Sequence, residues 1–310
     1  MTTELHGLLV VDKPSGATSH DVVASARRLY GTRRVGHAGT LDPLATGVLV
    51  LLFGEATKLS EIATVAHKTY RTVISFGRST HSHDADGNTT AEAPFAMSDL
   101  EPAALERALE RERARTQQMP PAVSAIKLNG RRAHELTRRG EAPELSQRAV
   151  RVEALQLCAR SDTTLSFELT VSKGYYVRAF ARDLSASLGI PAHVSELRRL
   201  RSGHFSVEEA CSWPASSAVP LVPFRSALPR LLPVLRLKDR GIQRARCGQL
   251  LERDDFFDDP EVTDDRLQTT TMWAWTDKDG LPIAIGRRDA GGYRVRRGFA
   301  LGADELETAL

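Results

Sequence analysis

The pattern of apolar positions along the chain predicts a mixture of short strands and helices. Runs of aliphatic, β-branched and aromatic residues favour strands. Such runs occur at residues 8–12, 48–53, 68–76, 150–159 and 165–172. Helices are predicted at residues 22–30, 98–115 and 176–188. The periodicity by itself leaves the architecture open, because these elements are compatible with several folds.

The predicted helices have recognisable boundaries. Ser19 or Asp21 is expected to cap the first helix, and Gly31 follows its last turn. The second helix has apolar residues on one face and mostly charged residues on the other. Gly189 and Pro191 follow the third helix and are expected to end it.

Turn-forming residues divide the sequence into two parts. Residues 214–233 are rich in Pro and Ser and are typical of a connector. Beyond them, short strand-like runs are separated by turn signals such as residues 277–280 and 291–292. We therefore predict two domains, residues 1–231 and residues 232–310.

Composition adds the expectation of a cytoplasmic protein without disulfides or metal. Of the 310 residues, 41% are hydrophobic, which is enough for a core that needs no covalent staples. The 3 cysteines are far apart and lack zinc-ligand spacing. No apolar run approaches the ~20 residues that span a bilayer, and residues 1–6 lack the features of a signal peptide. We therefore expect no association with a membrane.

Charge is distributed unevenly along the chain. The formal net charge is +3, but residues 252–265 hold eight acids and one base and carry −7, so the remainder carries +10. An excess of this size suits a polyanionic partner such as a nucleic acid. Basic globular proteins without such a partner are common, so charge alone does not decide the function.

The most informative stretch is residues 36–47, GHAGTLDPLATG, which lies between a predicted helix and a predicted strand. Glycine permits backbone geometries that other residues avoid, and a residue before proline is pushed toward extended geometry. A rigid loop of this kind can present one carboxylate, that of Asp42. From spacing alone, an ordinary Asp-Pro turn is the simpler interpretation.

The same stretch closely resembles the catalytic-loop motif of the bacterial tRNA pseudouridine-55 synthases, the pseudouridine synthase B family. Further blocks match in the order found in that family: GLLVVDKPSGATSHDVV, KTYRTVISFG, QMPPAVSAIKLNGRRAHEL, SKGYYVRAFARDL and HVSELRRLRSG. Together the blocks span residues 7 to about 205. Several ordered blocks are far more specific than one motif, so the chain is identified as a member of this family.

The resemblance implies a fold and a reaction. The implied fold is α+β, with a mixed, mostly antiparallel sheet, flanking helices and a small β-rich C-terminal domain of the PUA type. The implied reaction is isomerisation of uridine 55 in the T-loop of tRNA. The N1–C1′ bond breaks, the base turns, and the base rejoins the sugar through C5. Because the product is an isomer, the resemblance implies no cofactor and no metal.

Two implied site residues form an ion pair. Asp42 falls on the family's catalytic aspartate, and Arg178 falls on the arginine that pairs with it. A neighbouring cation favours the ionised carboxylate, and arginine can hold it with two hydrogen bonds. Asp42 could attack the base at C6, attack the sugar at C1′ or remove a ribose proton, and the sequence leaves these routes open. Without the motif, Arg178 would be interpreted as a surface residue.

Other implied residues surround the target base. Tyr70 is expected to stack on the uracil and to remove the C5 proton. Tyr176 is expected to line the base pocket in preference to Tyr175, since adjacent residues of an extended segment face opposite ways. Leu197 is expected near the uracil edge. From spacing alone, Tyr70 and Leu197 would be interpreted as core residues.

The remaining expectations concern the grip on RNA. His37 is expected to contact the remodelled T-loop, and Lys13 to have a structural or phosphate-directed role. Residues 118–149 resemble the family's mobile insertion, which closes over the T-stem loop. The acidic stretch at 252–265 is expected to point away from RNA. The C-terminal domain is expected to hold the acceptor stem through Arg287, Arg288, Arg294, Arg296 and Arg297.

Some interpretations stay open. His81 and His83 stand where relatives usually have a more Asp-rich turn, and a metal site there is disfavoured because no further ligands cluster nearby. A non-catalytic RNA chaperone could use the same surface, although the intact set of Asp42, Tyr70 and Arg178 favours catalysis. A guide-RNA-dependent relative would tend to carry long basic extensions, whereas here the first matching block starts at residue 7 and the tail is short and acidic. We therefore favour a stand-alone bacterial enzyme that acts as a monomer on tRNA.

Overall fold

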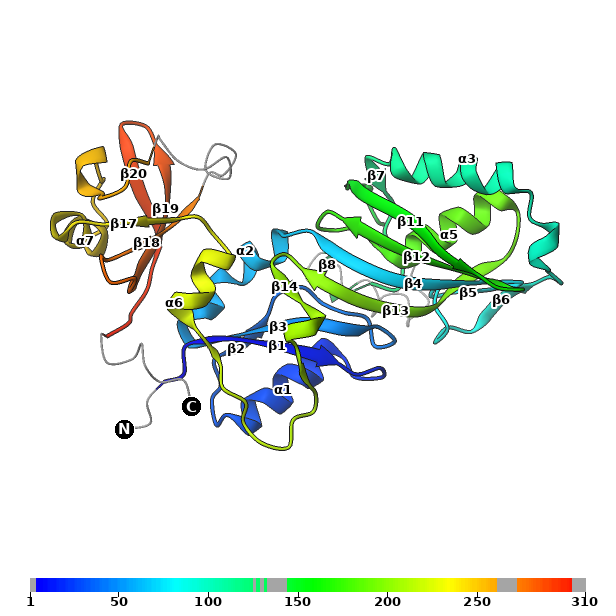
Figure 1. Cartoon of the computed structure of the whole chain (residues 1–310), viewed down its shortest axis with the longest axis horizontal. Helices are drawn as coiled ribbons and strands as arrows, with labels where there is room; N and C mark the ends of the chain where they lie inside the picture. The colour runs from blue at the N-terminus through cyan, green and yellow to red at the C-terminus, as the bar shows by residue number, and fades with distance from the viewer. Residues whose placement is uncertain (1–3, 125–126, 129–130, 133–143, 261–271, 303–310) are drawn as a thin grey trace.

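The structure is a computed structural model that describes residues 4–124, 127–128, 131–132, 144–260 and 272–302. The molecule is elongated, and a large sheet runs along its middle (Figure 1). Seven of the ten strands of this sheet follow one another in the order β11 (Val152–Arg160), β12 (Thr164–Val171), β4 (Lys68–Phe76), β13 (Ala192–Ser202), β3 (Thr46–Phe53), β1 (Gly7–Lys13) and β15 (Cys211–Ser212). The other three strands pair at its margins: β2 (Val35–His37) with β3, β14 (Phe205–Ser206) with β13, and β16 (Val222–Pro223) with β1.

The pairing within this sheet is mixed. Strands β13 and β3 run parallel, as do β1 and β15. The remaining pairs are antiparallel. The predicted strands correspond to β1, β3, β4, β11 and β12, so the expectation of a mixed, mostly antiparallel sheet is confirmed. Strand β13, at the centre of the sheet, was not predicted from periodicity because three arginines interrupt its apolar pattern.

Alternating side chains of β1 and β3 face two separate hydrophobic clusters. Leu9 and Leu49 belong to the main cluster, which also contains the buried faces of α1 (Ser19–Leu29), α3 (Pro102–Arg113) and α5 (Val177–Leu188). Leu8 and Val48 belong to the second cluster, beside α2 (Ser60–Val65) and α6 (Phe224–Ala227). This alternation is the period of two that a strand buried on both faces requires.

Helix α1 begins differently from the prediction. Its N-cap is Thr18, which forms a capping box with Asp21, so the expectation that Ser19 or Asp21 caps the helix is wrong. Ser19 instead exchanges hydrogen bonds with the backbone of Leu41: its Oγ donates to the carbonyl at 3.2 Å and accepts from the amide at 2.8 Å. The start of α1 is therefore attached to the segment that carries Asp42.

Helix α3 is shorter than predicted. It begins at Pro102 instead of residue 98, and Met97–Asp99 forms a separate 3₁₀ turn, η2. Proline fits the first turn of a helix because it lacks an amide hydrogen that would go unused there. Helix α5 begins at Val177, with Tyr176 as its N-cap.

A second sheet holds the C-terminal part of the chain. Its strands follow in the order β17 (Val234–Arg236), β18 (Trp273–Thr276), β19 (Pro282–Asp289) and β20 (Gly292–Gly298), and α7 (Asp239–Arg246) packs beside it. We call these four strands the C-terminal sheet. It lies at one end of the molecule, and α3 and α5 lie at the other (Figure 1).

The segment predicted as a connector is structured. Residues 214–233 include β16, α6 and the 3₁₀ turn η4 (Leu228–Arg230), and Phe224 and Leu228 are buried in the second cluster. Its apolar residues anchor it to the large sheet, so it is not a free linker. The boundary near residue 232 stays a prediction.

The remaining elements are short. They are η1 (Gly54–Leu59), β5 (Arg78–Thr80), β6 (Thr89–Glu92), β7 (Gln117–Gln118), β8 (Lys127–Leu128), β9 (Arg131–Arg132), β10 (Arg148–Ala149), η3 (Val207–Glu209) and η5 (Arg253–Asp255). Strands β7 and β10 pair at the base of the predicted insertion, whose central residues 133–143 lie outside the described ranges. Among the helices of the described ranges, none has the length and apolar character to cross a bilayer.

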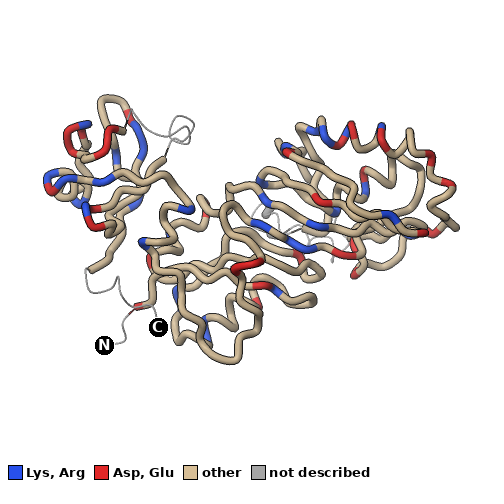
Figure 2. The backbone as a smooth tube through the Cα atoms, viewed as in Figure 1, with Lys and Arg blue, Asp and Glu red and all other residues tan. Residues whose placement is uncertain are grey.

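Arginines neutralise the described part of the acidic stretch. Asp255, whose side chain is fully buried, pairs with Arg240 and Arg244 of α7. Asp258 forms an ion pair with Arg236 of β17. Positive and negative segments accordingly alternate through the C-terminal part of the chain (Figure 2). Residues 261–265 of the stretch lie outside the described ranges, so its predicted orientation relative to RNA stays a prediction.

Candidate active site

The loop between β2 and β3, residues 38–45, presents Asp42. The loop is tied to the turn after β1, since the amide of Gly16 donates to the carbonyl of Pro43 at 2.9 Å. Within the loop, the amide of Ala45 donates to the carbonyl of Asp42 at 3.1 Å. These bonds fix the backbone on the C-terminal side of the aspartate, and the contact of Ser19 with Leu41 fixes it on the N-terminal side.

Arg199 supports the loop from the sheet. Its side chain lies in the interior, and the residue is 1% exposed. Its Nε donates to the carbonyl of Val48 at 2.7 Å, and its Nη2 donates to that of Gly39 at 3.0 Å. A Cβ on Gly47 would come within 2.2 Å of the Arg199 carbonyl oxygen, so glycine is required where the loop meets the sheet. No sequence pattern indicates this use of Arg199.

Lys13 lies beneath the same loop. It is 0% exposed, and its Nζ donates to the carbonyls of Pro14 at 2.8 Å, Ala17 at 2.6 Å and Pro43 at 3.1 Å. Burial lowers the pKa of Lys13 to about 8, although the nearby charge of Asp42 opposes this shift. Of the two roles predicted for Lys13, these contacts favour the structural one. Binding a phosphate would require Lys13 to give up its hydrogen bonds to three carbonyls.

Asp42 and Arg178 form a two-point ion pair. The Nε of Arg178 donates to Oδ2 of Asp42 at 2.8 Å, and its Nη2 donates to Oδ1 at 2.9 Å. The arginine side chain is 4% exposed, whereas that of Asp42 is 31% exposed. The Nη1 of Arg178 donates to the carbonyl of Ser82 at 3.0 Å. A fixed guanidinium thus holds a carboxylate that a substrate can still reach.

A second carboxylate, that of Asp84, shares this arginine and was not predicted. Asp84 lies 3.5 Å from the Nε of Arg178, its side chain is 8% exposed, and it accepts a hydrogen bond from Ser82. Burial raises the pKa of Asp84, and the bond from Ser82 and the charge of Arg178 only partly offset this effect. The sequence offers only a turn-like DADG segment as a signal for this residue.

His83 carries this segment through an unusual backbone conformation. Its φ is +62°, and it is the one non-glycine residue of the described ranges with a positive φ. This conformation places the Ser82 carbonyl and the Asp84 carboxylate where both meet Arg178. Burial, with help from nearby arginines, lowers the pKa of His83 to about 4, so this histidine is neutral near pH 7.

The two adjacent tyrosines face different surroundings. Tyr175 is 8% exposed, and its hydroxyl donates to Glu112 of α3 at 2.7 Å. Burial and the charge of Glu112 raise the pKa of Tyr175 well above its usual value. Tyr176 is held by its backbone, which exchanges hydrogen bonds with the side chain of Gln118 at 2.8 and 3.2 Å. Burial also raises the pKa of Tyr176, with a contribution from Asp42.

The structure places the other predicted site residues in different surroundings. Tyr70 of β4 is half-buried and packs against the main cluster. Leu197 of β13 is 7% exposed and belongs to the same cluster. For His37, burial and then the nearby charge of Arg199 lower the pKa. Its Nδ1 is buried without a hydrogen-bond partner in the described structure.

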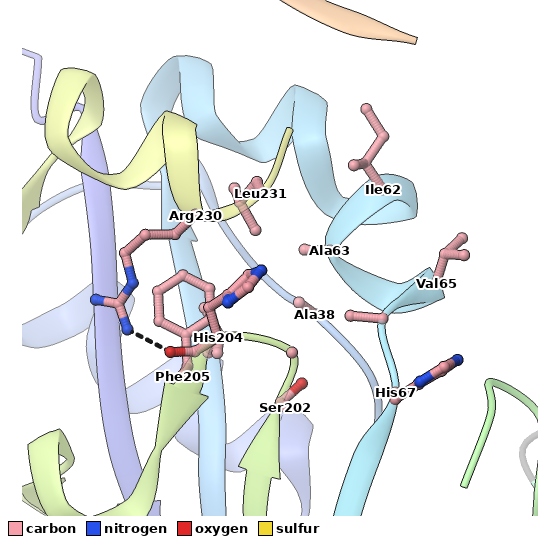
Figure 3. A pocket seen from close by; sticks show the side chains of 13 residues that line it. Ala38, Ile62, Ala63, Val65, His67, Ser202, His204, Phe205, Arg230 and Leu231 are labelled. Carbon is pink, nitrogen blue, oxygen red and sulfur yellow. Dashed lines mark hydrogen bonds between the residues drawn. The ribbon is translucent and has the colours of Figure 1, made fainter. Parts of the chain in front are cut away.

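A separate pocket of about 490 Å³ lies between α2, the β13–β14 hairpin and η4 (Figure 3). Arg230 closes one side by donating to the carbonyl of His204 at 2.7 Å. None of the predicted site residues lines this pocket; Ala38 alone reaches it from the loop that carries Asp42. Among the described residues, no group of three or more histidine, cysteine or acidic side chains is arranged to hold a metal ion.

Comparison with known proteins identifies the family. Residues 27–177 match the family described as TruB family pseudouridylate synthase (N terminal domain). The chain is 45% identical over 210 residues to tRNA pseudouridine synthase B of Mycobacterium tuberculosis (strain H37Rv), which covers 66% of this chain and 70% of that protein. It belongs to the TruB family of pseudouridylate synthases. A 46% identity over 208 residues links it to the protein of the same name from Mycolicibacterium paratuberculosis, with 66% and 70% covered.

Solved structures share the fold of nearly the whole chain. A chain of the archaeal box H/ACA sRNP Nop10-Cbf5 complex superposes with a TM-score of 0.65 at 19% identity, covering 99% of this chain and 90% of that one. A chain of a Cbf5-Nop10-Gar1 complex gives a TM-score of 0.65 at 20% identity, with 96% and 84% covered. At such identity the likeness concerns the fold, and it confirms the predicted α+β class.

Proposed function

We propose that this chain converts uridine to pseudouridine in tRNA, at position 55 of the T-loop, with Asp42 as the catalytic carboxylate. The curated relatives at 45% and 46% identity are tRNA pseudouridine synthases, which supports the reaction and the RNA class. The observation that carries the proposal is the two-point pairing of a part-exposed Asp42 with the buried Arg178. The guanidinium orients the carboxylate, and the exposed part of Asp42 leaves it within reach of a substrate.

The reaction requires a base outside the helical stack. Extruding the nucleotide costs a few kcal/mol, and stacking on an aromatic side chain returns about 1–3 kcal/mol. Tyr70 and Tyr176 supply the aromatic rings in this proposal, and Leu197 and His37 contact the base and the loop around it. Asp42 assists cleavage of the N1–C1′ bond. After the base turns, C5 bonds to C1′, Tyr70 takes the C5 proton, and N1 acquires a proton.

The proposal extends to the rest of the RNA. The C-terminal sheet is taken as a PUA-like domain that binds the acceptor stem, and residues 118–149 as the insertion that closes over the T-stem loop. Phosphate contacts of this kind make binding salt-dependent. We also propose that the protein acts as a monomer in the cytoplasm and that Lys13 acts structurally, by holding the loop.

Base-resolution mapping of pseudouridine in an unmodified tRNA transcript tests the proposal. Wild-type protein should modify uridine 55 alone, and Asp42→Asn should bind the transcript without modifying it. Asp162→Asn, an exposed carboxylate in the turn between β11 and β12, is the matched control and should behave as wild type. Pseudouridine formed by Asp42→Asn would exclude Asp42 as the catalytic group. Refolding of tRNA by a wild-type protein that forms no pseudouridine would favour the RNA-chaperone alternative.

A further inference from the structure

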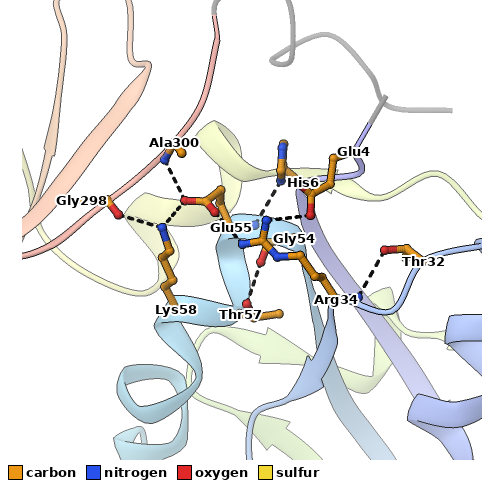
Figure 4. Close-up of polar contacts among 10 residues, drawn as sticks. All are labelled: Glu4, His6, Thr32, Arg34, Gly54, Glu55, Thr57, Lys58, Gly298 and Ala300. Atoms are coloured by element: carbon orange, nitrogen blue, oxygen red, sulfur yellow. Dashed lines mark hydrogen bonds and ion pairs between the residues drawn. The ribbon is translucent and has the colours of Figure 1, made fainter. Parts of the chain in front are cut away.

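The segment that leaves the C-terminal sheet is bound by two charged residues of η1. Glu55 accepts a hydrogen bond from the amide of Ala300 at 2.8 Å and also accepts from the Nζ of Lys58 (Figure 4). Lys58 donates in addition to the carbonyl of Gly298 at 2.9 Å. Residues 298–300, which begin at the last residue of β20, are therefore held at both ends. We call Glu55 and Lys58 the clasp.

Apolar packing reinforces the same contact. The ring of Phe299 meets that of Phe224 of α6 edge to face, with centroids 5.0 Å apart. The amide of Phe299 donates to the carbonyl of Ile283 in β19 at 2.9 Å. Ile285 of the C-terminal sheet is buried in the same cluster as Phe224 and Leu228. The clasp thus lies beside a packed joint between the C-terminal sheet and the large sheet.

The charges of the clasp make this joint specific in geometry. The Glu55 side chain is 3% exposed and also accepts from Arg34 at 2.6 Å. Burial opposes ionisation of Glu55, but the bonds from Lys58, Ala300 and Arg34 outweigh it and lower its pKa. A buried carboxylate that loses a partner is strongly destabilised, so the clasp adds a constraint on geometry to the apolar packing. The clasp therefore selects one orientation of the C-terminal sheet.

That orientation determines where a basic surface lies. The side chains of β19 and β20 include five exposed arginines, Arg287, Arg288, Arg294, Arg296 and Arg297. Such a pair of strands attracts a phosphate backbone. An RNA bound along it is placed relative to Asp42 only as accurately as the joint holds the two sheets.

We propose that Glu55 and Lys58 are positioning residues that hold the C-terminal sheet in the orientation in which the enzyme binds full-length tRNA. They hold the arginines of β19 and β20 at the place where the stem of tRNA lies when its T-loop enters the Asp42 site. The inference rests on the proposed function. A short T-arm hairpin does not extend to the C-terminal sheet in this arrangement, so its modification should not depend on the clasp.

The test compares two RNAs with matched variants. Lys58→Met should raise KM for full-length tRNA about tenfold, which corresponds to roughly 1.4 kcal/mol, and leave kcat unchanged. Its KM for a T-arm hairpin should stay within about twofold of the wild-type value, since the C-terminal sheet does not contribute to binding of the hairpin. Lys58→Arg, which keeps a donor and the charge, should restore most of the affinity for tRNA. Lys278→Met removes an equal charge from the exposed turn before β19 and should leave both values unchanged.

A second measurement needs no activity. Glu55→Gln should enlarge the radius of gyration in small-angle X-ray scattering, because the C-terminal sheet samples further orientations. An unchanged scattering profile in this variant would overturn the proposal, as would an equal rise in KM for the two RNAs in Lys58→Met. A wild-type protein that modifies neither RNA would instead contradict the proposed function, so the two failures are distinguishable.

Discussion

Substitution of Arg178 examines how the carboxylate of Asp42 is held. Arg178 donates twice to Asp42 and once to the carbonyl of Ser82, and it also faces Asp84 at 3.5 Å. Arg178→Lys keeps the charge but cannot reproduce a planar fork. Arg178→Met removes the charge as well and leaves the buried Asp84 without its facing cation.

The structure separates the magnitudes expected for the two variants. Removing one partner of a buried ion pair typically destabilises a protein by about 3–5 kcal/mol, which we expect for Arg178→Met. Arg178→Lys loses hydrogen bonds to charged groups but retains the charge, so a loss of about 1–3 kcal/mol is expected. Both variants should fold, since domain stability is about 5–15 kcal/mol. Both should isomerise uridine about 100-fold more slowly, because misplacing a reacting group by ~1 Å has that effect.

Urea unfolding followed by tryptophan fluorescence measures the stability, and single-turnover pseudouridine formation measures the rate. Arg113→Met is the matched control, because Arg113 pairs with Glu106 on the exposed face of α3. An exposed pair of this kind contributes about 0–1 kcal/mol. Wild-type turnover by Arg178→Lys would refute the claim that the fork orients Asp42. A stability of Arg178→Met equal to that of Arg113→Met would refute the buried ion pair.

Four further substitutions test other parts of the structure. Tyr175→Phe removes a buried bond to Glu112 and should lower stability by about 1–2 kcal/mol without slowing the reaction; Tyr176→Ala should do the reverse, lowering kcat/KM about tenfold or more through lost stacking, and the opposite pattern would contradict our assignment. Hydrogen bonds lower the pKa of Asp255 despite its burial, so its stabilisation is present above pH 3.8, the ordinary value, and is lost as pH falls through the folded-state pKa. Urea midpoints of Asp255→Asn and wild type should therefore differ most near neutral pH and converge in acid. Burial lowers the pKa of Lys68 from 10.5 to about 7, so the unfolded chain binds more protons between these values, and wild type should gain stability over Lys68→Met as pH rises from 7 to 10.5. A pH-independent difference would exclude a buried, neutralised amine.

The elements that were predictable are those whose apolar residues repeat without interruption. Strands β1 and β3 are buried on both faces and read as continuous apolar runs, as expected for central strands. Strand β13 is equally central, yet Arg198, Arg199 and Arg201 lie within it. Arg199 is buried because two backbone carbonyls accept its hydrogen bonds, a circumstance that no local pattern reveals.

Predictability of the site followed a different rule. The family resemblance supplied Asp42 and Arg178 as partners, and the structure brings them together across 136 residues of sequence. Spacing alone could not have paired them, since the contact depends on how α5 packs against the loop of residues 38–45. Asp84 joins them next to His83, which adopts a positive φ, and sequence rules predict such a conformation for glycine much sooner than for histidine.

The loop that carries Asp42 is supported by two buried cations. Lys13 and Arg199 are both buried beneath residues 38–45, and the hydrogen bonds of both go to backbone carbonyls, which are uncharged. Among the described residues, neither cation forms a direct ion pair with a carboxylate, and Lys13 interacts favourably with the charge of Asp42. Lys13 thus acts twice, because it fixes the backbone of the loop and also attracts the charge of Asp42, whereas Arg199 fixes the backbone.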